Sequence, residues 1–330
     1  MSMVGKILGF SAQLAPWIVV GSLGYAAAFI KPKVEPMPLP QPLVEPRDVF
    51  YDVDTDIGES YWFVGNAGTV LQSGEGKEEW KRHELPEPIN LQGVAVSSKG
   101  DVVAAGNQGA VFVLRKGSSD WSSHRLPVSD RAGKMVEVAW IDDAFWVIGE
   151  MGAIFKSDAA AESWKQLGID EDVSLNDIAR SPDGGLWIAA EFGLVLYSDD
   201  AGETWSQSEL GRESLRALAF DPSGNGVIVG NNGSVMHSSD SGESWSSVDS
   251  ATEEHLYDVG YTGEFWLAVG NSGAILKSPN GKTWERLRLE GFGSGYHTRL
   301  LATANRTVIA GETIGELTGS TWLSWPVEEN

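Results

Sequence analysis

The sequence predicts an all-β protein, a seven-bladed β-propeller with four-stranded blades, preceded by an N-terminal transmembrane helix and a proline-rich linker. Three observations support this prediction. A strand-turn-strand pattern recurs at a nearly constant interval, each copy precedes a polar loop that ends in tryptophan, and an uncharged segment and a proline-rich segment come before the first copy. The predicted domains are an anchor over 1–30, a stalk over 31–46 and the propeller over 47–330.

The composition limits the classes of function. A chain of 330 residues is long enough for one large all-β domain. It contains no cysteine, which excludes disulfides and thiolate metal sites. The formal net charge of −22 argues against a surface that follows phosphates, so we expect no nucleic-acid partner.

The composition of the N-terminal segment predicts a membrane anchor. Residues 7–30 carry no charged side chain, and a helix of this length would span about 36 Å, enough to cross a bilayer. A cleaved signal peptide is the alternative, because the alanines at 26–28 offer a small-residue cleavage site, but its apolar region is usually only about 7–15 residues long. Two pairs of small residues would allow close packing against another membrane helix: Ser11 with Ala15, and Gly24 with Ala28.

The stalk follows directly. Residues 31–46 contain six prolines, which fix the backbone angle φ and remove hydrogen-bond donors. We expect an extended, semi-rigid spacer that reaches up to about 50 Å.

Seven repeats make up the rest of the chain. Each unit opens with an alternating apolar stretch, continues through a second strand into a glycine-containing turn, and ends with a third strand, a tryptophan loop and a fourth strand. Steps of 41, 43, 41, 40, 40 and 41 residues separate the turn anchors, which are Gly65, Gly106, Gly149, Ala190, Gly230, Gly270 and Gly311. Four strands in about 40–45 residues are typical of a propeller blade.

The closure of the ring is left open by this pattern. Each repeat begins with its innermost strand and finishes with its outermost strand, so no strand borrowed between the two ends is evident. The stretch 42–49 is a candidate contribution to closure.

The loop 197–205, with the sequence YSDDAGETW, contains three acids that could mark a metal loop, a catalytic cluster or a turn. The loop 237–245 repeats it closely, and other blades retain progressively less beyond the tryptophan, which favours a packing turn. Its spacing also fails the calcium-loop pattern. The predicted structural residues are Ser198, Asp200, Gly202, Thr204 and Trp205, with Ser238, Asp240, Gly242, Ser244 and Trp245.

This motif resembles the Asp-box, or BNR repeat, of sialidases and related propellers. Together with the preceding Val-Gly-x-x-Gly-x-Val pattern it is most similar to the photosystem II stability/assembly-factor family, over residues 47–325. The resemblance implies a non-enzymatic propeller without cofactor or small-molecule substrate, which assists a membrane complex on the periplasmic or lumenal side of the inner or thylakoid membrane. Relatives in non-photosynthetic bacteria occur near RND-type exporters, so an integral membrane complex, specifically such a transporter, is the implied partner.

The alternative function is a glycan-binding or sialidase-like propeller. Its reaction would need an arginine cluster and a tyrosine-glutamate pair on the face opposite the Asp-boxes. Arg216 and Arg299 are interpreted as equivalent early positions of two first strands, as are Tyr51 and Tyr257. The histidines have no metal-ligand spacing, and no phosphate-binding or nucleophile motif is present in the sequence.

The turns between second and third strands point to the same rim. Three of them carry a glutamate where other blades have asparagine, and glutamate is the poorer turn residue. Neighbouring blades 3 and 4 could therefore present an acidic patch to a basic partner. The predicted partner-binding rim comprises Tyr51, Arg216, Tyr257, Arg299, Glu150, Glu191 and Glu312.

Overall fold

The computed structural model describes residues 16–25, 43–56, 60–74, 79–129, 133–303 and 306–325. The chain divides into two units, Met1–Pro42 and Leu43–Asn330. In the first unit the described residues form one helix over 16–25, and its apolar side chains, such as Trp17 and Leu23, are exposed.

The predicted membrane anchor is only partly covered by the described residues. No helix within the described ranges is both long enough and apolar enough to cross a membrane. Gly24 lies on the helix over 16–25, whereas Ser11, Ala15 and Ala28 lie outside the described residues, as does the predicted stalk up to residue 42. The membrane span and its packing pairs therefore stay predictions.

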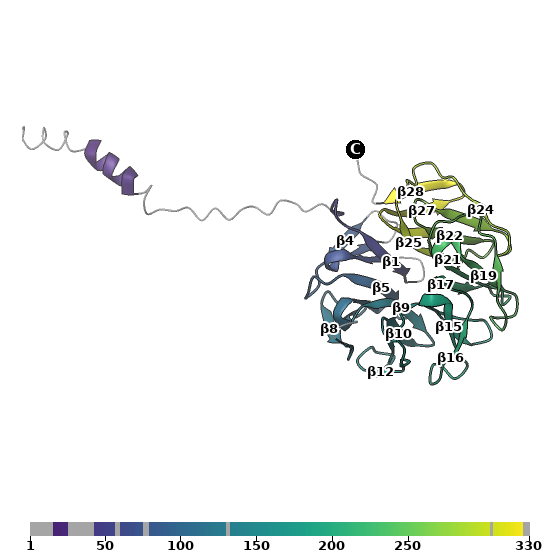
Figure 1. The fold of residues 1–330 in the computed structure, drawn as a ribbon. Helices are drawn as coiled ribbons and strands as arrows, with labels where there is room; N and C mark the ends of the chain where they lie inside the picture. Colours follow the sequence, from purple (N-terminus) through teal and green to yellow (C-terminus); the bar gives the residue numbers. More distant parts are fainter. Residues whose placement is uncertain are drawn as a thin grey trace, which may run out of the picture. The chain divides into compact units, whose positions relative to one another are not determined.

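The second unit is a seven-bladed β-propeller, which confirms the predicted fold class. Its described residues form seven four-stranded antiparallel sheets arranged around a central axis (Figure 1), and each sheet consists of four consecutive strands. The strands of blades 1 to 3 are β1 (Phe50–Thr55), β2 (Tyr61–Gly65), β3 (Val70–Ser73), β4 (Trp80–His83), β5 (Leu91–Val96), β6 (Val102–Gly106), β7 (Ala110–Leu114), β8 (Trp121–Arg125), β9 (Met135–Ile141), β10 (Ala144–Gly149), β11 (Ile154–Ser157) and β12 (Trp164–Gln166).

The remaining four blades repeat this order, with the innermost strand first. Their strands are β13 (Leu175–Arg180), β14 (Leu186–Ala190), β15 (Leu194–Ser198), β16 (Ser206–Glu209), β17 (Leu215–Phe220), β18 (Gly226–Gly230), β19 (Val235–Ser238), β20 (Ser246–Val248), β21 (Leu256–Tyr261), β22 (Trp266–Gly270), β23 (Ile275–Ser278), β24 (Glu285–Arg286), β25 (His297–Ala302), β26 (Thr307–Gly311), β27 (Ile314–Thr318) and β28 (Thr321–Trp325). Short 3-10 turns join second and third strands in four blades: η1 (Asn66–Gly68), η3 (Asn107–Gly109), η4 (Glu191–Gly193) and η5 (Asn231–Gly233).

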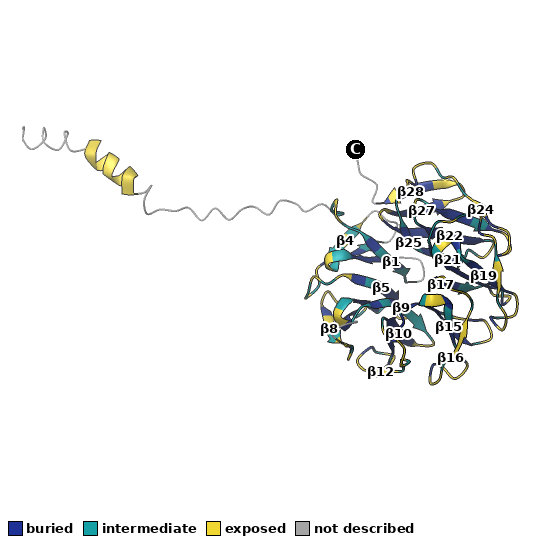
Figure 2. Cartoon of the chain, viewed as in Figure 1, coloured by how far each residue is buried: buried dark blue, intermediate teal, exposed yellow. Residues whose placement is uncertain are grey.

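The apolar core lies between neighbouring blades. The second strand of each blade is buried along its whole length, because both of its faces pack against adjacent sheets. The outer strand β16, by contrast, is exposed throughout, and Figure 2 shows this change from a buried interior to an exposed periphery. One cluster of buried residues joins each adjacent pair of blades, including blades 7 and 1.

Every innermost strand contains a β-bulge near its start. In β1 the pairing register shifts between Phe50 and Asp52, and β25 shifts in the same way between His297 and Arg299. The equivalent shift occurs in the other five inner strands. A bulge leaves one residue unpaired and redirects the next one, and the redirected third residues of most inner strands line the central channel.

The ring closes without an exchanged strand. β25 to β28 form blade 7 by themselves, and side chains join that blade to blade 1. Thr298 Oγ1 donates to the Phe50 carbonyl at 3.1 Å, and the Trp325 ring lies 5.5 Å from the Tyr61 ring and 5.9 Å from the Trp80 ring. The segment before β1 adds packing rather than a strand, because Leu43 and Val44 contact this same cluster.

We expect Trp325→Ala to destabilise the propeller by about 3–5 kcal/mol, the usual cost of deleting a buried tryptophan side chain. Trp325 is 7% exposed at the seam between blades 7 and 1. Urea unfolding followed by tryptophan fluorescence measures the loss. The matched control is Leu323→Ala on the same strand, which is 48% exposed and should change stability little. Equal effects of the two substitutions would contradict this account of closure.

Candidate functional site

The central channel contains a cluster of ionisable residues. The third residue of each inner strand follows the bulge, so seven equivalent positions surround the axis. Four of them hold an acid and one holds an arginine. In chain order these residues are Asp52, Gly93, Glu137, Asp177, Ala217, Asp258 and Arg299.

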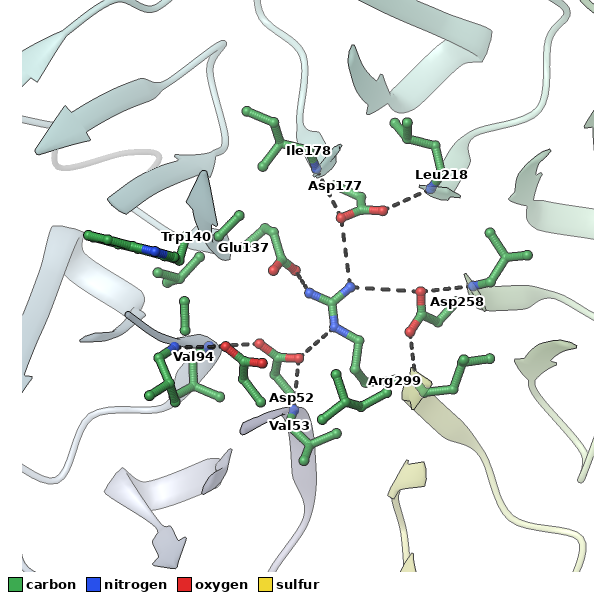
Figure 3. A pocket seen from close by; sticks show the side chains of 18 residues that line it. Asp52, Val53, Val94, Glu137, Trp140, Asp177, Ile178, Leu218, Asp258 and Arg299 are labelled. Carbon is green, nitrogen blue, oxygen red and sulfur yellow. Dashed lines mark hydrogen bonds and ion pairs between the residues drawn. The ribbon is translucent and has the colours of Figure 1, made fainter. Parts of the chain in front are cut away.

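Arg299 is the centre of this channel network, as Figure 3 shows. Its Nε lies 2.5 Å from Asp52 Oδ1, and its Nη2 pairs with the Glu137 carboxylate. Its Nη1 lies 3.7 Å from Asp177 Oδ1 and 3.8 Å from Asp258 Oδ1. The arginine of blade 7 therefore contacts acids from blades 1, 3, 4 and 6.

The three channel aspartates also join neighbouring blades through backbone hydrogen bonds. Asp52 accepts one N–H from Val53 and one from Val94 of blade 2, the latter at 2.7 Å. Asp177 accepts from Leu218 of blade 5 at 2.8 Å, and Asp258 accepts from blade 7 in the same way. Each of these carboxylates thus satisfies an edge N–H of the next inner strand.

A further acid in blade 1 also accepts a backbone N–H from the inner strand of the next blade. Asp54 accepts the Val96 N–H of blade 2 at 2.7 Å, two residues beyond the contact made by Asp52. It lines the same cavity, of about 390 Å³, as the channel network.

Burial shifts the proton affinities of these groups. It raises the pKa of Asp54 and of Asp258 to about 7, and it raises the pKa of Glu137 well above its usual range despite the nearby Arg299. Burial alone would lower the pKa of Arg299, but the surrounding carboxylates outweigh it and raise that pKa. The channel holds more acids than cations, so part of its carboxylates take up protons near neutral pH.

The hydrogen bonds and ion pairs of the channel residues mainly stabilise the fold. Carboxylates with a pKa near 7 can act as general acids or bases, but each channel aspartate is already held by backbone N–H groups or by Arg299. In the described part of the chain, no group of three or more histidine, cysteine, aspartate or glutamate side chains is arranged to hold a metal ion.

Arg216 and Arg299 are not equivalent, which corrects the sequence interpretation. Arg216 is the second residue of β17, the bulge position that Tyr51 and Tyr257 occupy in their strands, whereas Arg299 is the third residue of β25. The difference of one residue turns Arg299 into the channel, where its side chain is only 18% exposed. Arg216 instead donates through Nε to Asn231 Oδ1 at 3.0 Å.

Five of the seven predicted rim residues fall into two sectors. Tyr51, Tyr257 and Glu312 lie near Tyr296, where blades 6, 7 and 1 meet. Burial first, and then the charges of these three neighbours, raise the pKa of the Tyr296 phenol. The other predicted rim acids belong to blades 3 and 4.

Glu150 and Glu191 take over a hydrogen bond that asparagine makes elsewhere. In blade 1, Asn66 Oδ1 accepts the Val49 N–H at 2.8 Å. In blade 3, Glu150 accepts the Lys134 N–H at 3.2 Å, and in blade 4, Glu191 accepts the Ser174 N–H at 3.3 Å. The turns thus keep their bond to the residue that precedes the innermost strand of their own blade, while adding a negative charge.

The acids of the Asp-box loops bond within their own turns. Asp200 accepts Thr204 N–H at 2.9 Å and Thr204 Oγ1–H at 2.6 Å, and these bonds lower its pKa to about 2. Ser198 Oγ accepts Gly202 N–H at 2.8 Å, and a side chain at Gly202 would meet the Trp146 ring of blade 3 at 2.5 Å. The second loop repeats this arrangement with Ser238, Asp240, Gly242 and Ser244, and a side chain at Gly242 would meet the Trp187 ring of blade 4.

Blade 3 achieves the same turn with a displaced acid. Its loop lacks the aspartate and glycine of the motif, and Asp158 stands one position earlier. Asp158 nevertheless accepts the N–H groups of Ala160, Glu162 and Ser163. The turn depends on where the carboxylate lies in space rather than on the motif position.

Sequence reasoning missed the channel acids. Asp52, Glu137, Asp177 and Asp258 share one position in the repeat, directly after the bulge residue. The signal in the sequence is the start of the first strand, which in four units reads as an apolar residue, any residue, an acid and a second apolar residue.

Comparison with known proteins agrees with this architecture. A sequence profile described as Photosynthesis system II assembly factor YCF48 matches residues 64–217 and 210–315. The structure of YCF48 from Cyanidioschyzon merolae is similar with a TM-score of 0.64 and 19% identity, covering 83% of this chain and 94% of that chain. YCF48 bound to D1 peptide gives a TM-score of 0.63 and 20% identity, covering 80% and 90%.

Enzymes also share the fold. Virginiamycin B lyase from Staphylococcus aureus gives a TM-score of 0.70 and 13% identity, covering 80% of this chain and 92% of that chain. At these identities the structural similarities show the fold alone. No curated protein matches the sequence.

We expect Arg299→Gln to destabilise the propeller by about 3–5 kcal/mol at pH 8, because it leaves buried carboxylates without their cation. The loss should be smaller at pH 5, where these raised-pKa acids are protonated in the folded state. Urea unfolding at both pH values measures the difference. The control is Arg216→Gln, which removes an arginine at the rim. A loss independent of pH would show that charge in the channel is not the cause.

Asp54→Asn should stabilise the protein at pH 8 by on the order of 1 kcal/mol. The pKa of Asp54 is about 7 in the folded state and has a usual value of 3.8. The folded state binds the Asp54 proton more tightly than the unfolded state does. This stabilising contribution is therefore complete below pH 3.8 and is lost as the pH rises through about 7. Asparagine stays neutral throughout. Thermal melts at pH 4 and 8 test this, with exposed Asp199→Asn as control, and a variant less stable than the unaltered protein at pH 8 would contradict it.

Proposed function

Because the chain belongs to the family of photosynthesis system II assembly factor YCF48, we propose that it is a non-enzymatic propeller that binds a protein segment of a membrane complex. It acts as an assembly factor or an accessory subunit of that complex. The RND-type exporter that the sequence resemblance implied is the more specific form of this proposal.

The observation that carries the proposal is the channel network. Arg299 pairs with acids of four other blades, and the aspartates among them also accept backbone N–H groups of neighbouring strands. Charged groups used in this way hold the ring together, and a reaction would need them free to exchange protons or to bind substrate. The surfaces left for function are the rims and the outer strands.

Peptide binding has a precedent in the family. One YCF48 structure contains a bound D1 peptide, so a propeller of this kind can recognise a segment of another chain. We extend to this protein the mode of binding, a peptide segment on the propeller, and not the identity of the peptide.

The N-terminal segment supports a location at a membrane. The helix over 16–25 exposes Trp17, Ile18 and Leu23, and apolar side chains of this size favour an apolar environment. We propose that residues 1–30 anchor the protein in the inner or thylakoid membrane, with the propeller on the periplasmic or lumenal side.

Gentle detergent extraction of the tagged protein should recover an integral membrane protein in stoichiometric amounts, identified by mass spectrometry. Deleting residues 1–30 should lower the recovered partner at least about tenfold, because the anchor keeps the propeller at high effective concentration near it. A protein that elutes alone, and that retains or cleaves glycans instead, would refute the proposed function.

A further inference from the structure

Two large apolar side chains stand exposed at equivalent turns of blades 3 and 4. In the described part of the propeller, the exposed large apolar residues are Met151, Phe192 and Leu323, with exposed fractions of 46%, 66% and 48%. Met151 and Phe192 are both the second residue of the turn between second and third strands. One of these turns, η4, packs beside β17 and exposes its Phe192.

The backbone at these positions does not favour such side chains. The turn residues have a left-handed conformation, with φ of 57° at Met151 and 60° at Phe192. This conformation costs a bulky residue about 1–2 kcal/mol and suits asparagine or glycine better. Other blades place Ala67, Gln108, Asn232 and Ser272 there. Neither burial nor backbone geometry therefore accounts for methionine and phenylalanine at these two turns.

An acidic loop lies between the two turns. The loop 168–174 connects β12 to β13, and its Val173 carbonyl accepts the Gly152 N–H at 2.8 Å, next to Met151. The following residue, Ser174, donates its N–H to Glu191 at 3.3 Å, next to Phe192. One short segment thus contacts both turns and carries the exposed side chains of Asp170, Glu171 and Asp172.

The charge around the two apolar side chains is strongly negative. The turns 150–152 and 191–193 and the loops 168–174 and 210–214 together contain six acids and one cation. Lys134, whose backbone bonds to Glu150, adds a second cation at this surface. The loop 210–214 belongs to this surface because Leu210 donates its N–H to the Gly193 carbonyl at 2.8 Å. The charged residues of these turns and loops are Glu150, Asp170, Glu171, Asp172, Glu191, Arg212 and Glu213.

We propose that Met151, Phe192 and the acidic loop form a docking surface for a positively charged peptide segment that also carries apolar side chains. This inference rests on the proposed function and assigns the segment to the membrane-complex partner. The acids attract and orient the cationic segment, and the two apolar side chains supply the contact area that retains it. A second copy of this chain, with a net charge of −22, is repelled by the same acids, as is an anionic lipid surface.

A double substitution tests the docking surface in the full-length protein. Met151→Asn with Phe192→Asn should reduce the recovered partner at least about tenfold, while the melting temperature stays the same or rises because asparagine suits the left-handed backbone. The matched control, Gln108→Asn with Ser272→Asn, changes the same turn position in blades 2 and 6 and should retain the partner. A lower melting temperature without loss of partner would show that the two side chains serve folding.

Photocrosslinking identifies what contacts the surface. Benzoylphenylalanine replacing Phe192 in the full-length, membrane-bound protein should crosslink to a segment of the co-purifying protein that is positively charged and contains apolar residues. Benzoylphenylalanine replacing Gln108 should give at most about a tenth of that product. Crosslinks to lipid, to a second copy, or to a neutral or acidic segment would overturn the inference.

The two proposals fail in different ways. If no membrane protein co-purifies with the unaltered chain, the proposed function fails and this inference fails with it. If a partner co-purifies and the Met151→Asn/Phe192→Asn variant retains it, or Phe192 gives no crosslink, only the docking surface is refuted.

Discussion

The structure depends on closing a ring whose two ends share no strand. Each blade is made of consecutive strands, so side chains must hold the last blade to the first. Arg299 of blade 7 does this at the axis, where it meets Asp52 across 247 residues of sequence, and Trp325 does it at the periphery. Contacts this distant in sequence form only after the intervening chain has folded, so they make the stability of the whole propeller depend on a complete ring.

The channel network also satisfies exposed edge groups of three inner strands, β5, β17 and β25. An innermost strand presents unpaired backbone groups to the channel side of its sheet. Asp52, Asp177 and Asp258 each accept an N–H from the neighbouring inner strand, which fixes the blades in register. Burying several carboxylates around one guanidinium is costly, and the raised pKa values of Asp54 and Asp258 show that cost. The buried carboxylates thus cost electrostatic free energy, and their hydrogen bonds define the positions of neighbouring blades.

The sequence predicted the elements that repeat and missed those that depend on a bulge. The blade number, the four strands and their order from inside to outside follow from period-2 alternation and glycine turns, which are local properties. The channel acids do not, because alternation counted through Tyr51 or Arg216 assigns the next residue to the wrong face. An early position in its strand predicts a rim position for Arg299, whereas the bulge turns its side chain into the channel. Asp158 shows a related limit, since a turn can keep its hydrogen bonds when the acid moves by one position.

Residues that differ from their equivalents in the other blades are better indicators of a binding surface than residues that all blades share. A ring of equivalent turns offers equivalent surfaces, so a partner that binds one sector requires that sector to differ. Blades 3 and 4 differ twice at the same turn. Glu150 and Glu191 preserve the hydrogen bond of asparagine with a longer, charged side chain, and Met151 and Phe192 place apolar bulk where the backbone disfavours it. The first change keeps the fold and adds charge, whereas the second gains nothing for the fold. Their coincidence on adjacent blades is the basis of the proposed docking surface.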